Sequence, residues 1–244
     1  LLKGARRFGF EQIQELLVEK VHETTLDVNL SSVVANLGHY RAMMAPGAKL
    51  VCMVKADAYG AGAVEIAKTL QDHRVEYLAV AVADEGVTLR RNGITQSIIV
   101  MNPEMSSLKT LFDYDLEPEV YSFRLLEALV KAARREGVKG HPCHIKLDTG
   151  MCRLGFHPQH DMDRLIAMLK AHDEIVPRSV FSHFVGADSD GFDTFSDCQY
   201  EEFREGSDRL IEAFPHHILR HICNSAGIEH FPQRQLDMCR LGIG

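Results

Sequence analysis

The sequence predicts an α/β protein folded as one (β/α)8 barrel, and three observations support this class. Runs rich in β-forming residues alternate with longer helical patterns, as in the repeated βα units of a parallel sheet. The strand candidates number eight, and 244 residues with 45% hydrophobic content suffice for one barrel. A doubly wound sheet is disfavoured, because the chain has no glycine-rich dinucleotide fingerprint.

The predicted elements follow one another in a regular order. The eight strand candidates are 49–54, 77–82, 97–101, 117–121, 143–148, 179–183, 219–223 and 236–240. Apolar residues spaced three and four apart predict helices between them at 63–72, 123–136, 162–172 and 199–213. In such a barrel the carboxyl ends of all strands meet at one mouth, so polar residues at those ends are the candidates for chemistry.

Residues 1–31 precede the barrel, which is expected over 32–244. Helical spacing of apolar residues over 8–21 predicts an amphipathic helix, which we interpret as a linker helix within 1–22. A ninth strand is predicted over 24–30, and we treat residues 23–31 around it as a separate segment before the barrel. A closed eight-stranded sheet has no place for it, so it is expected to pair elsewhere.

Composition excludes several classes of function. The net charge is −7 and no dense Lys/Arg run occurs, which disfavours a nucleic-acid or anionic-membrane surface. No apolar run approaches the roughly 18 residues of a membrane span, and the amino end lacks the apolar core of a signal peptide. Six cysteines without a CxxC pair fit reduced thiols in the cytoplasm. The paired histidines lack acidic or cysteine neighbours at ligand spacing, so no metal site is expected.

Lys55 is the first candidate for catalysis. It directly follows the apolar run of the first strand. A lysine at the carboxyl end of a buried strand is the arrangement that a pyridoxal-phosphate enzyme needs for its Schiff base. Tyr59, Gly60 and Gly62 follow in a tight turn whose glycines permit close backbone approach to an anionic group. By itself, a lysine just past a strand is more often a solvated loop residue, and the motif that follows Lys55 is what favours a functional role.

Polar residues also mark the ends of the later strands, and their convergence around one mouth is the argument for a site. Each alone has a structural explanation: His183 as a core histidine, Ser225 as a helix N-cap, and Arg240 in a strand-end salt bridge. The strand-end residues are Lys55, Asp148, His183, Asn224, Ser225 and Arg240. Arg240 is followed by flexible glycine-containing backbone in the region where such barrels often hold phosphate.

The segment 146–155 places a lysine inside the barrel. Residues two apart on a strand share a face, so His144, Lys146 and Asp148 point one way and the intervening apolar residues face the helices. An unpaired ammonium inside the barrel is strongly disfavoured, so Lys146 needs a partner or a modification. Arg153, on the following turn, is placed to meet a cofactor phenolate or a substrate carboxylate, or to form a surface ion pair with Asp148.

These motifs resemble the cofactor-binding barrel of bacterial alanine racemase. They are VKADAYGAG at 54–62, KLDTGMCRLGF at 146–156, SHF at 182–184, NSA at 224–226 and RLGIG at 240–244, and they occur in family order. The resemblance implies a pyridoxal 5'-phosphate cofactor and a small amino acid substrate, alanine. It also implies D-alanine formation for peptidoglycan synthesis.

The resemblance implies a role for each site residue. Lys55 would form the Schiff base and move the α-proton on one face of the substrate, and Arg153 would hydrogen-bond the phenolic oxygen and orient substrate. The phosphate would be held by Tyr59, Ser225 and the backbone of Gly242 and Ile243. His183 would pack near the pyridine ring, Arg240 would sit at the pyridine nitrogen, and Asn224 would support the cofactor neighbourhood. Lys146 is expected to be carbamylated and to pair with Arg153.

Racemisation needs a second base on the opposite face of the substrate. The resemblance implies a tyrosine from the carboxyl-terminal β-domain of the partner subunit in a homodimer. The chain stops at Gly244, so it is expected to be a fragment that binds the cofactor but racemises poorly by itself. The strand at 24–30 is expected to join that domain.

Two departures from the family and two alternatives complete the picture. Ala61 stands where the family usually has histidine, and Cys152 where it usually has glycine. Residues 1–7 resemble the tail of the muramoyl-tripeptide:D-alanyl-D-alanine ligase family, which implies a fusion with an upstream ligase domain. The alternatives are a non-catalytic pyridoxal-phosphate-binding barrel in cofactor homeostasis and a cofactor-free interaction scaffold.

Overall fold

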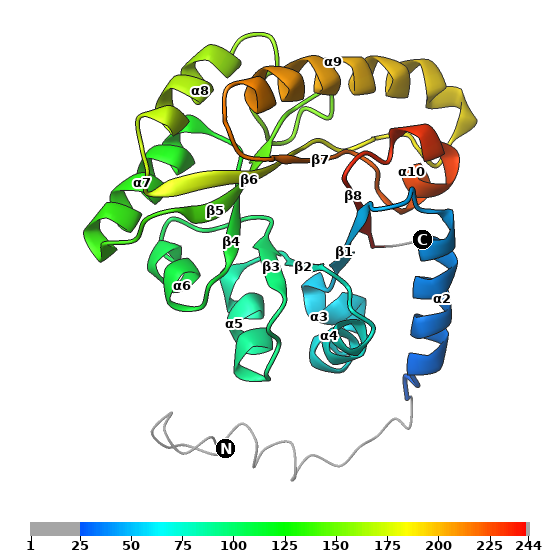
Figure 1. The fold of residues 1–244 in the computed structure, drawn as a ribbon. Coiled ribbons are helices and arrows are strands. Elements are labelled where there is room, and N and C mark those ends of the chain that lie inside the picture. Colours follow the sequence, from blue (N-terminus) through cyan, green and yellow to red (C-terminus); the bar gives the residue numbers. More distant parts are fainter. Residues whose placement is uncertain (1–24, 243–244) are drawn as a thin grey trace, which may run out of the picture.

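The structure is a computed structural model that describes residues 25–242, except the side chain of Asp190. Eight parallel strands form the centre of the molecule and helices lie outside them (Figure 1). The strands are β1 (Lys49–Met53), β2 (Tyr77–Val80), β3 (Ser97–Val100), β4 (Glu117–Val120), β5 (His141–Lys146), β6 (Ile175–Phe181), β7 (Leu219–His221) and β8 (Met238–Leu241). Each overlaps a predicted strand, so the predicted (β/α)8 class is confirmed.

The sheet closes on itself. Its ladder runs β7-β6-β5-β4-β3-β2-β1-β8. Two backbone hydrogen bonds then join the ends: Asp237 N–H donates to Arg220 O at 3.1 Å, and Arg240 N–H donates to Cys223 O at 3.0 Å. The pairing of β1 with β8 in this ladder brings residues near position 55 beside residues near position 240, although nearly the whole barrel separates them in sequence.

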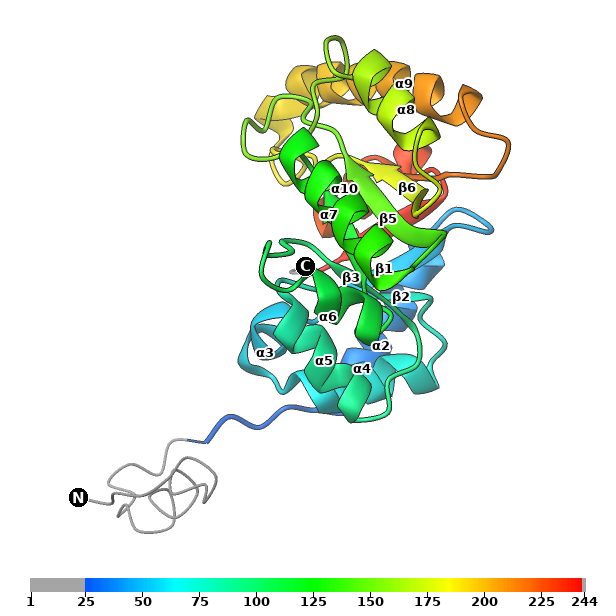
Figure 2. The ribbon, with the colours of Figure 1, turned by 90° about the vertical axis from the view of Figure 1, so that its left-hand side faces the viewer.

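The helices cover the outer face of the barrel. They are α2 (Leu30–Met43), α3 (Lys55–Gly60), α4 (Ala63–Asp72), α5 (Ala83–Arg91), α6 (Leu108–Asp113), α7 (Phe123–Glu136), α8 (Met162–Lys170), α9 (Asp193–Glu212) and α10 (Ser225–His230), with 3₁₀ turns η2 (Asp190–Phe192) and η3 (Pro232–Arg234). The predictions at 63–72 and 123–136 agree at both ends, whereas α9 begins six residues before the predicted 199. Figure 2 shows α7, α8 and α9 beside β5 and β6, with α3 to α6 at the other half of the barrel.

The strand predicted over 24–30 does not form in the part that the structure describes. Residues 25–29 have no regular structure, and α2 begins at Leu30, two residues before the expected start of the barrel at 32. Asn29 caps this helix, because its side-chain oxygen accepts a hydrogen bond from Ser32 N–H at 3.1 Å. No described strand lies beside 25–29 to supply ladder hydrogen bonds. The predicted helix at 8–21 lies outside the described residues.

The alternation of side chains along the strands creates two apolar layers. The larger layer lies between strands and helices and includes Cys143, Ile145 and Leu147 of β5 and its end. A smaller cluster fills the lumen, formed by Val51, Tyr77, Ala79, Ile99, Leu219 and Met238. The inward direction predicted for His144 and Lys146 is therefore confirmed. Over residues 25–242, no helix combines the length and the apolar character needed to cross a membrane.

Candidate active site

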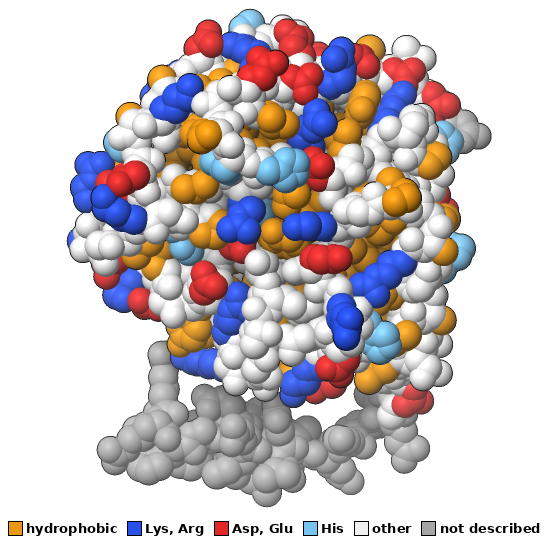
Figure 3. All heavy atoms as spheres, in the orientation of Figure 1, with side chains coloured by type: hydrophobic (Ala, Val, Ile, Leu, Met, Phe, Trp, Pro, Cys, Tyr) orange, Lys and Arg blue, Asp and Glu red, His pale blue; other side chains and the backbone are white. Residues whose placement is uncertain are grey.

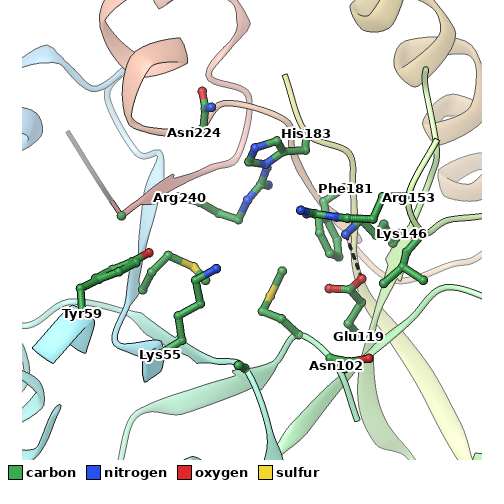
Figure 4. A pocket seen from close by; sticks show the side chains of 15 residues that line it. Lys55, Tyr59, Asn102, Glu119, Lys146, Arg153, Phe181, His183, Asn224 and Arg240 are labelled. Carbon is green, nitrogen blue, oxygen red and sulfur yellow. Dashed lines mark hydrogen bonds and ion pairs between the residues drawn. The ribbon is translucent and has the colours of Figure 1, made fainter. Parts of the chain in front are cut away.

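A cavity of about 700 Å³ opens at the carboxyl ends of the strands. In Figure 3, Lys, Arg and His side chains gather at the centre of the face shown, with an acidic side chain below them. Eight of the ten predicted site residues line the cavity: Lys55, Tyr59, Lys146, Arg153, His183, Asn224, Arg240 and Gly242. Ser225 lies directly behind Gly242, and Ile243 lies outside the described residues. The predicted convergence is thus observed for these residues (Figure 4), whereas Asp148, which was predicted with them, does not line the cavity.

Lys55 is followed by an unusual left-handed turn. The four residues from Ala56 to Tyr59 have φ between 51° and 58°, which costs about 1–2 kcal/mol for each L-residue. Hydrogen bonds hold this turn: Ala56 N–H donates to Glu85 Oε1 and Ala63 N–H donates to Asp57 Oδ1, both at 2.7 Å. The turn places Lys55 and Tyr59 on the same side of the cavity, as Figure 4 shows. Strain of this kind is typical of functional sites.

A small cradle formed by Tyr59, Ser225 and Gly242 lies beside this turn. Ser225 Oγ accepts a hydrogen bond from Gly242 N–H at 3.0 Å. A Cβ added at Gly242 would lie 3.1 Å from the Tyr59 hydroxyl oxygen, so the glycine leaves open the space between these groups. The predicted N-cap role of Ser225 is wrong, because Asn224 Oδ1 caps α10 by accepting from Gly227 N–H at 2.9 Å. The Ser225 hydroxyl instead supports the backbone at Gly242, on the side of the cavity where Tyr59 lies.

Arg240 is a fully buried cation with neutral partners. It donates to His221 Nδ1 and to the carbonyl oxygen of Ser182, each at 2.6 Å, and to Ile222 O at 3.1 Å. The predicted strand-end salt bridge is not formed among the described residues. Burial lowers the pKa of Arg240 to about 10, so the side chain stays charged at neutral pH. Burial, together with the charges of Arg240 and Arg153, lowers the pKa of His183 to about 3, so this ring is neutral.

A buried chain of side chains supports Arg240 from below. His221 Nε2 lies 3.0 Å from Ser179 Oγ, which lies 2.7 Å from His144 Nδ1, and His144 Nε2 lies 2.8 Å from Glu117 Oε2. Because Arg240 can only donate, His221 Nδ1 must accept and its hydrogen sits on Nε2. His221 Nε2–H then donates to Ser179 Oγ, and the Ser179 hydroxyl donates to His144 Nδ1. The hydrogen of His144 therefore sits on Nε2 and is donated to ionised Glu117. Every hydrogen of this relay then has an acceptor.

Lys146 has the partner that its inward position requires. Its Nζ lies 3.0 Å from Glu119 Oε1, and both side chains are almost fully buried. Burial raises the pKa of Glu119 to about 7, against the pull of Lys146, and burial lowers the pKa of Lys146. The sequence analysis missed Glu119. A signal was available, because Glu119 lies between apolar residues within a predicted buried strand, and a carboxylate in such a position needs a partner inside the barrel.

Arg153 stands on the turn after β5 and lines the same cavity. The alternative ion pair with Asp148 is not formed, because Asp148 Oδ1 accepts from the backbone of Gly150 at 3.1 Å and Cys152 at 3.0 Å. Cys152, where the family usually has glycine, adopts a left-handed φ of 56°. The cysteine is accommodated in this turn at a cost of about 1–2 kcal/mol.

Gly155 is required where this turn rejoins the barrel, and its replacement by alanine is expected to destabilise the fold. Its φ is +140°, and an added Cβ would lie 2.4 Å from Asp148 N and 2.7 Å from Leu147 C. Rigid backbone atoms cannot yield, so we expect a loss of about 3 kcal/mol in urea unfolding. Gly137→Ala is the matched control, since its φ is +70° with nothing within 4 Å, and about 1 kcal/mol is expected. Equal losses would contradict the close-approach argument.

The comparisons with known proteins agree with this geometry. The family described as alanine racemase, N-terminal domain, matches residues 28–244. Alanine racemase 1 of Oceanobacillus iheyensis is 34% identical over 228 residues, covering 93% of this chain and 60% of the relative. Alanine racemase of Clostridium kluyveri is 34% identical over 229 residues, covering 93% of this chain and 58% of the relative.

The solved structures give the same result. The structure of Clostridium difficile 630 alanine racemase in complex with cycloserine superposes with a TM-score of 0.86 at 32% identity, covering 92% of this chain and 62% of that chain. Alanine racemase of Bacillus anthracis superposes with a TM-score of 0.83 at 27% identity, covering 93% of this chain and 58% of that chain. The chain spans about 60% of the length of the curated relatives that it matches. The chain belongs to the alanine racemase N-terminal domain family.

Proposed function

We propose that this chain is the pyridoxal-phosphate-binding barrel of an alanine racemase, which interconverts L- and D-alanine and supplies D-alanine for peptidoglycan synthesis. The observation that carries the proposal is the arrangement of Lys55, the Tyr59–Ser225–Gly242 cradle and Arg240 around one cavity. The names of the relatives support alanine as the substrate. Cycloserine in one solved relative supports a small amino acid as the substrate class.

The described residues fit the chemical groups of this cofactor. The Lys55 amine would hold the cofactor covalently, and the Tyr59 and Ser225 hydroxyls with the backbone at 242–243 would bind its phosphate. When bound, pyridoxal phosphate stabilises negative charge at the substrate α-carbon. Arg240, a cation that cannot accept a proton, would donate to the pyridine nitrogen and keep it unprotonated.

The other residues would orient the bound groups. Arg153 would donate to the phenolic oxygen and position the substrate carboxylate. Neutral His183 would pack near the ring, and Asn224 would support the cofactor neighbourhood through its contacts with α10. Carbamylation of Lys146 stays a prediction of the resemblance.

Lys55 would move the α-proton on one face of the substrate, and we infer that the second base comes from outside the described residues. Tyr59, the tyrosine in the described cavity lining, lies on the same side as Lys55. His183 is too weak a base at a pKa of about 3, and Lys146 is held by Glu119. A tyrosine from a further domain of a partner subunit in a homodimer fits this need. We therefore expect the chain alone to bind the cofactor and to racemise poorly.

Two wider features belong to the same proposal. The cytoplasmic location is supported by the six cysteines, which are all free. The fusion with a muramoyl-tripeptide ligase rests on residues 1–7, which lie outside the described residues. Both are consistent with an enzyme that supplies D-alanine to cell-wall synthesis.

The first experiment is the visible absorption spectrum of the chain with pyridoxal phosphate, followed by borohydride reduction and peptide mass mapping. We expect a single modified lysine, Lys55. A full-length alanine racemase would show both the adduct and alanine turnover. An adduct on Lys55 without turnover fits the proposal for this chain and also the alternative of a non-catalytic barrel. Adding the carboxyl-terminal domain of a full-length relative, in trans or in cis, separates these two. Label spread over surface lysines would leave the interaction scaffold as the function.

A further inference from the structure

His221 contacts Arg240, and two neighbours fix the orientation of its ring. His221 Nδ1 lies 2.6 Å from Arg240 Nη1, and both side chains are buried. The Phe181 ring stacks on the His221 ring, with 4.8 Å between the centroids and 8° between the planes. Arg240 Cζ lies 5.2 Å from the centroid of the same Phe181 ring. Stacking fixes the plane of the His221 ring, but not which edge of the ring faces Arg240.

Ser179 fixes this edge. It is a fully buried residue of β6, and its hydroxyl oxygen lies 3.0 Å from His221 Nε2 and 2.7 Å from His144 Nδ1. A half-turn of the His221 ring about its Cβ–Cγ bond would take Nδ1 away from Arg240 and Nε2 away from Ser179. Buried polar groups would then lose their partners, which is unfavourable inside the barrel.

Glu117 gives this series of hydrogen bonds one direction. Its Oε2 lies 2.8 Å from His144 Nε2. Burial raises the pKa of Glu117, but hydrogen bonds from His144 and Ser97 lower it to about 2, so the carboxylate only accepts. Burial and the charge of Arg240 lower the pKa of His221 well below its usual value, so this ring carries one hydrogen. With a pure donor at one end and a pure acceptor at the other, each group between them has one arrangement of its hydrogens.

We propose that Ser179 and Glu117 are positioning residues that, through His144 and His221, hold Arg240 toward the pyridine nitrogen of the cofactor. Arg240 is the member of this series that lines the described cavity, so the other members act from the interior of the barrel. Without Ser179, the His221 ring is free to turn, and Arg240 Nη1 loses the acceptor that directs its guanidinium. The part of this role that concerns the cofactor rests on the proposed function, whereas the hydrogen positions do not.

The first test is ¹⁵N NMR of the histidine rings, assigned with His144→Gln and His221→Gln variants. In the wild-type chain we expect both rings to be neutral, with the hydrogen on Nε2 in each. Ser179→Ala should change the ring signals of both histidines, because it removes the hydroxyl that joins them. A hydrogen on Nδ1 of either ring, or a doubly protonated ring, in the wild-type chain would overturn the proposal.

The second test is the binding of pyridoxal phosphate labelled with ¹⁵N at its ring nitrogen. Ser179→Ala is expected to weaken binding about tenfold and to shift the ring-nitrogen signal, because Arg240 would donate less well to that nitrogen. Ser179→Thr retains the hydroxyl and should restore the wild-type signal. Ser207→Ala is the matched control, since Ser207 is equally buried but its hydroxyl donates to Arg204 O at 3.0 Å within α9, and it should change neither quantity.

A purely structural role of Ser179 predicts a different result. Ser179→Ala would then lower the midpoint of urea unfolding, and the ring-nitrogen signal of the bound cofactor would stay at its wild-type position. That outcome would refute the positioning role. If the wild-type chain binds no pyridoxal phosphate, the proposed function fails. The hydrogen positions of His144 and His221 in the wild-type chain decide the direction of the series in that case, and also if Ser179→Ala does not fold.

Discussion

Lys55→Ala is expected to abolish covalent attachment of pyridoxal phosphate to this chain. Two lysines line the described cavity, and they differ in electrostatic environment. The Nζ of Lys146 is engaged in a buried ion pair with Glu119 at 3.0 Å, whereas Lys55 makes no ion pair within the described residues. Removing Lys55 should therefore remove the attachment point without exposing a substitute. Borohydride reduction followed by peptide mapping measures the loss.

The matched control for this variant is Lys49→Ala. Lys49 begins β1 and Lys55 follows its end, so the two lysines lie at opposite ends of the same barrel strand. Lys49→Ala should retain full labelling at Lys55. Transfer of the label to Lys146 in the Lys55→Ala chain, at wild-type stoichiometry, would show that the ion pair with Glu119 does not keep Lys146 from reacting.

Glu117→Gln is expected to cost about 3 kcal/mol of stability at neutral pH. Burial alone raises the pKa of Glu117, but the hydrogen bonds from His144 and Ser97 lower it to about 2. The pKa of the folded state therefore lies below the unfolded value of 4.5, and the folded state binds fewer protons than the unfolded state. The stabilisation is fully present above pH 4.5 and is lost as the pH falls toward 2. Glutamine removes the charge and retains an oxygen that can accept from His144.

Urea unfolding at pH 7 and at pH 3 measures this effect. The difference between the wild-type chain and Glu117→Gln should be large at pH 7 and clearly smaller at pH 3. A surface carboxylate gives the comparison: Asp113 pairs with exposed Lys109, and Asp113→Asn should cost less than about 1 kcal/mol. A Glu117→Gln loss that is the same at both pH values would show that packing, and not ionisation, holds the relay together.

The location of the cavity-lining residues could be predicted from the sequence because the chemistry of a (β/α)8 barrel lies at the strand ends. Lys55, Arg153, His183 and Arg240 follow or end predicted strands, and the structure brings them to one cavity. The inward direction of Lys146 followed from the two-residue period of a strand. These are local properties of the chain, and they need no knowledge of which strand lies beside which.

Partners across the barrel could not be predicted in the same way. Glu119 meets Lys146 because β4 pairs with β5, and the register of that pair is set by packing of the whole barrel. The hydrogen-bonded chain from Glu117 to Arg240 connects five strands, β4 to β8, and no spacing in the sequence specifies it. The left-handed turn after Lys55 was also unexpected, because alanine and tyrosine do not favour positive φ unless tertiary hydrogen bonds hold them there.

The sequence by itself determined the barrel class, the family resemblance and the residues that face the mouth, because hydrophobic periodicity and motif order are properties of the linear chain. Tertiary structure alone decided that Ser225 contacts the backbone of Gly242 while Asn224 caps the helix, and that Lys146 meets a carboxylate and not a vacant space. The physical reason is burial. A charged group inside the barrel needs partners, an opposite charge for Lys146 or neutral acceptors for Arg240, among the groups that the closed sheet brings within about 3 Å, and closure is a property of all eight strands together.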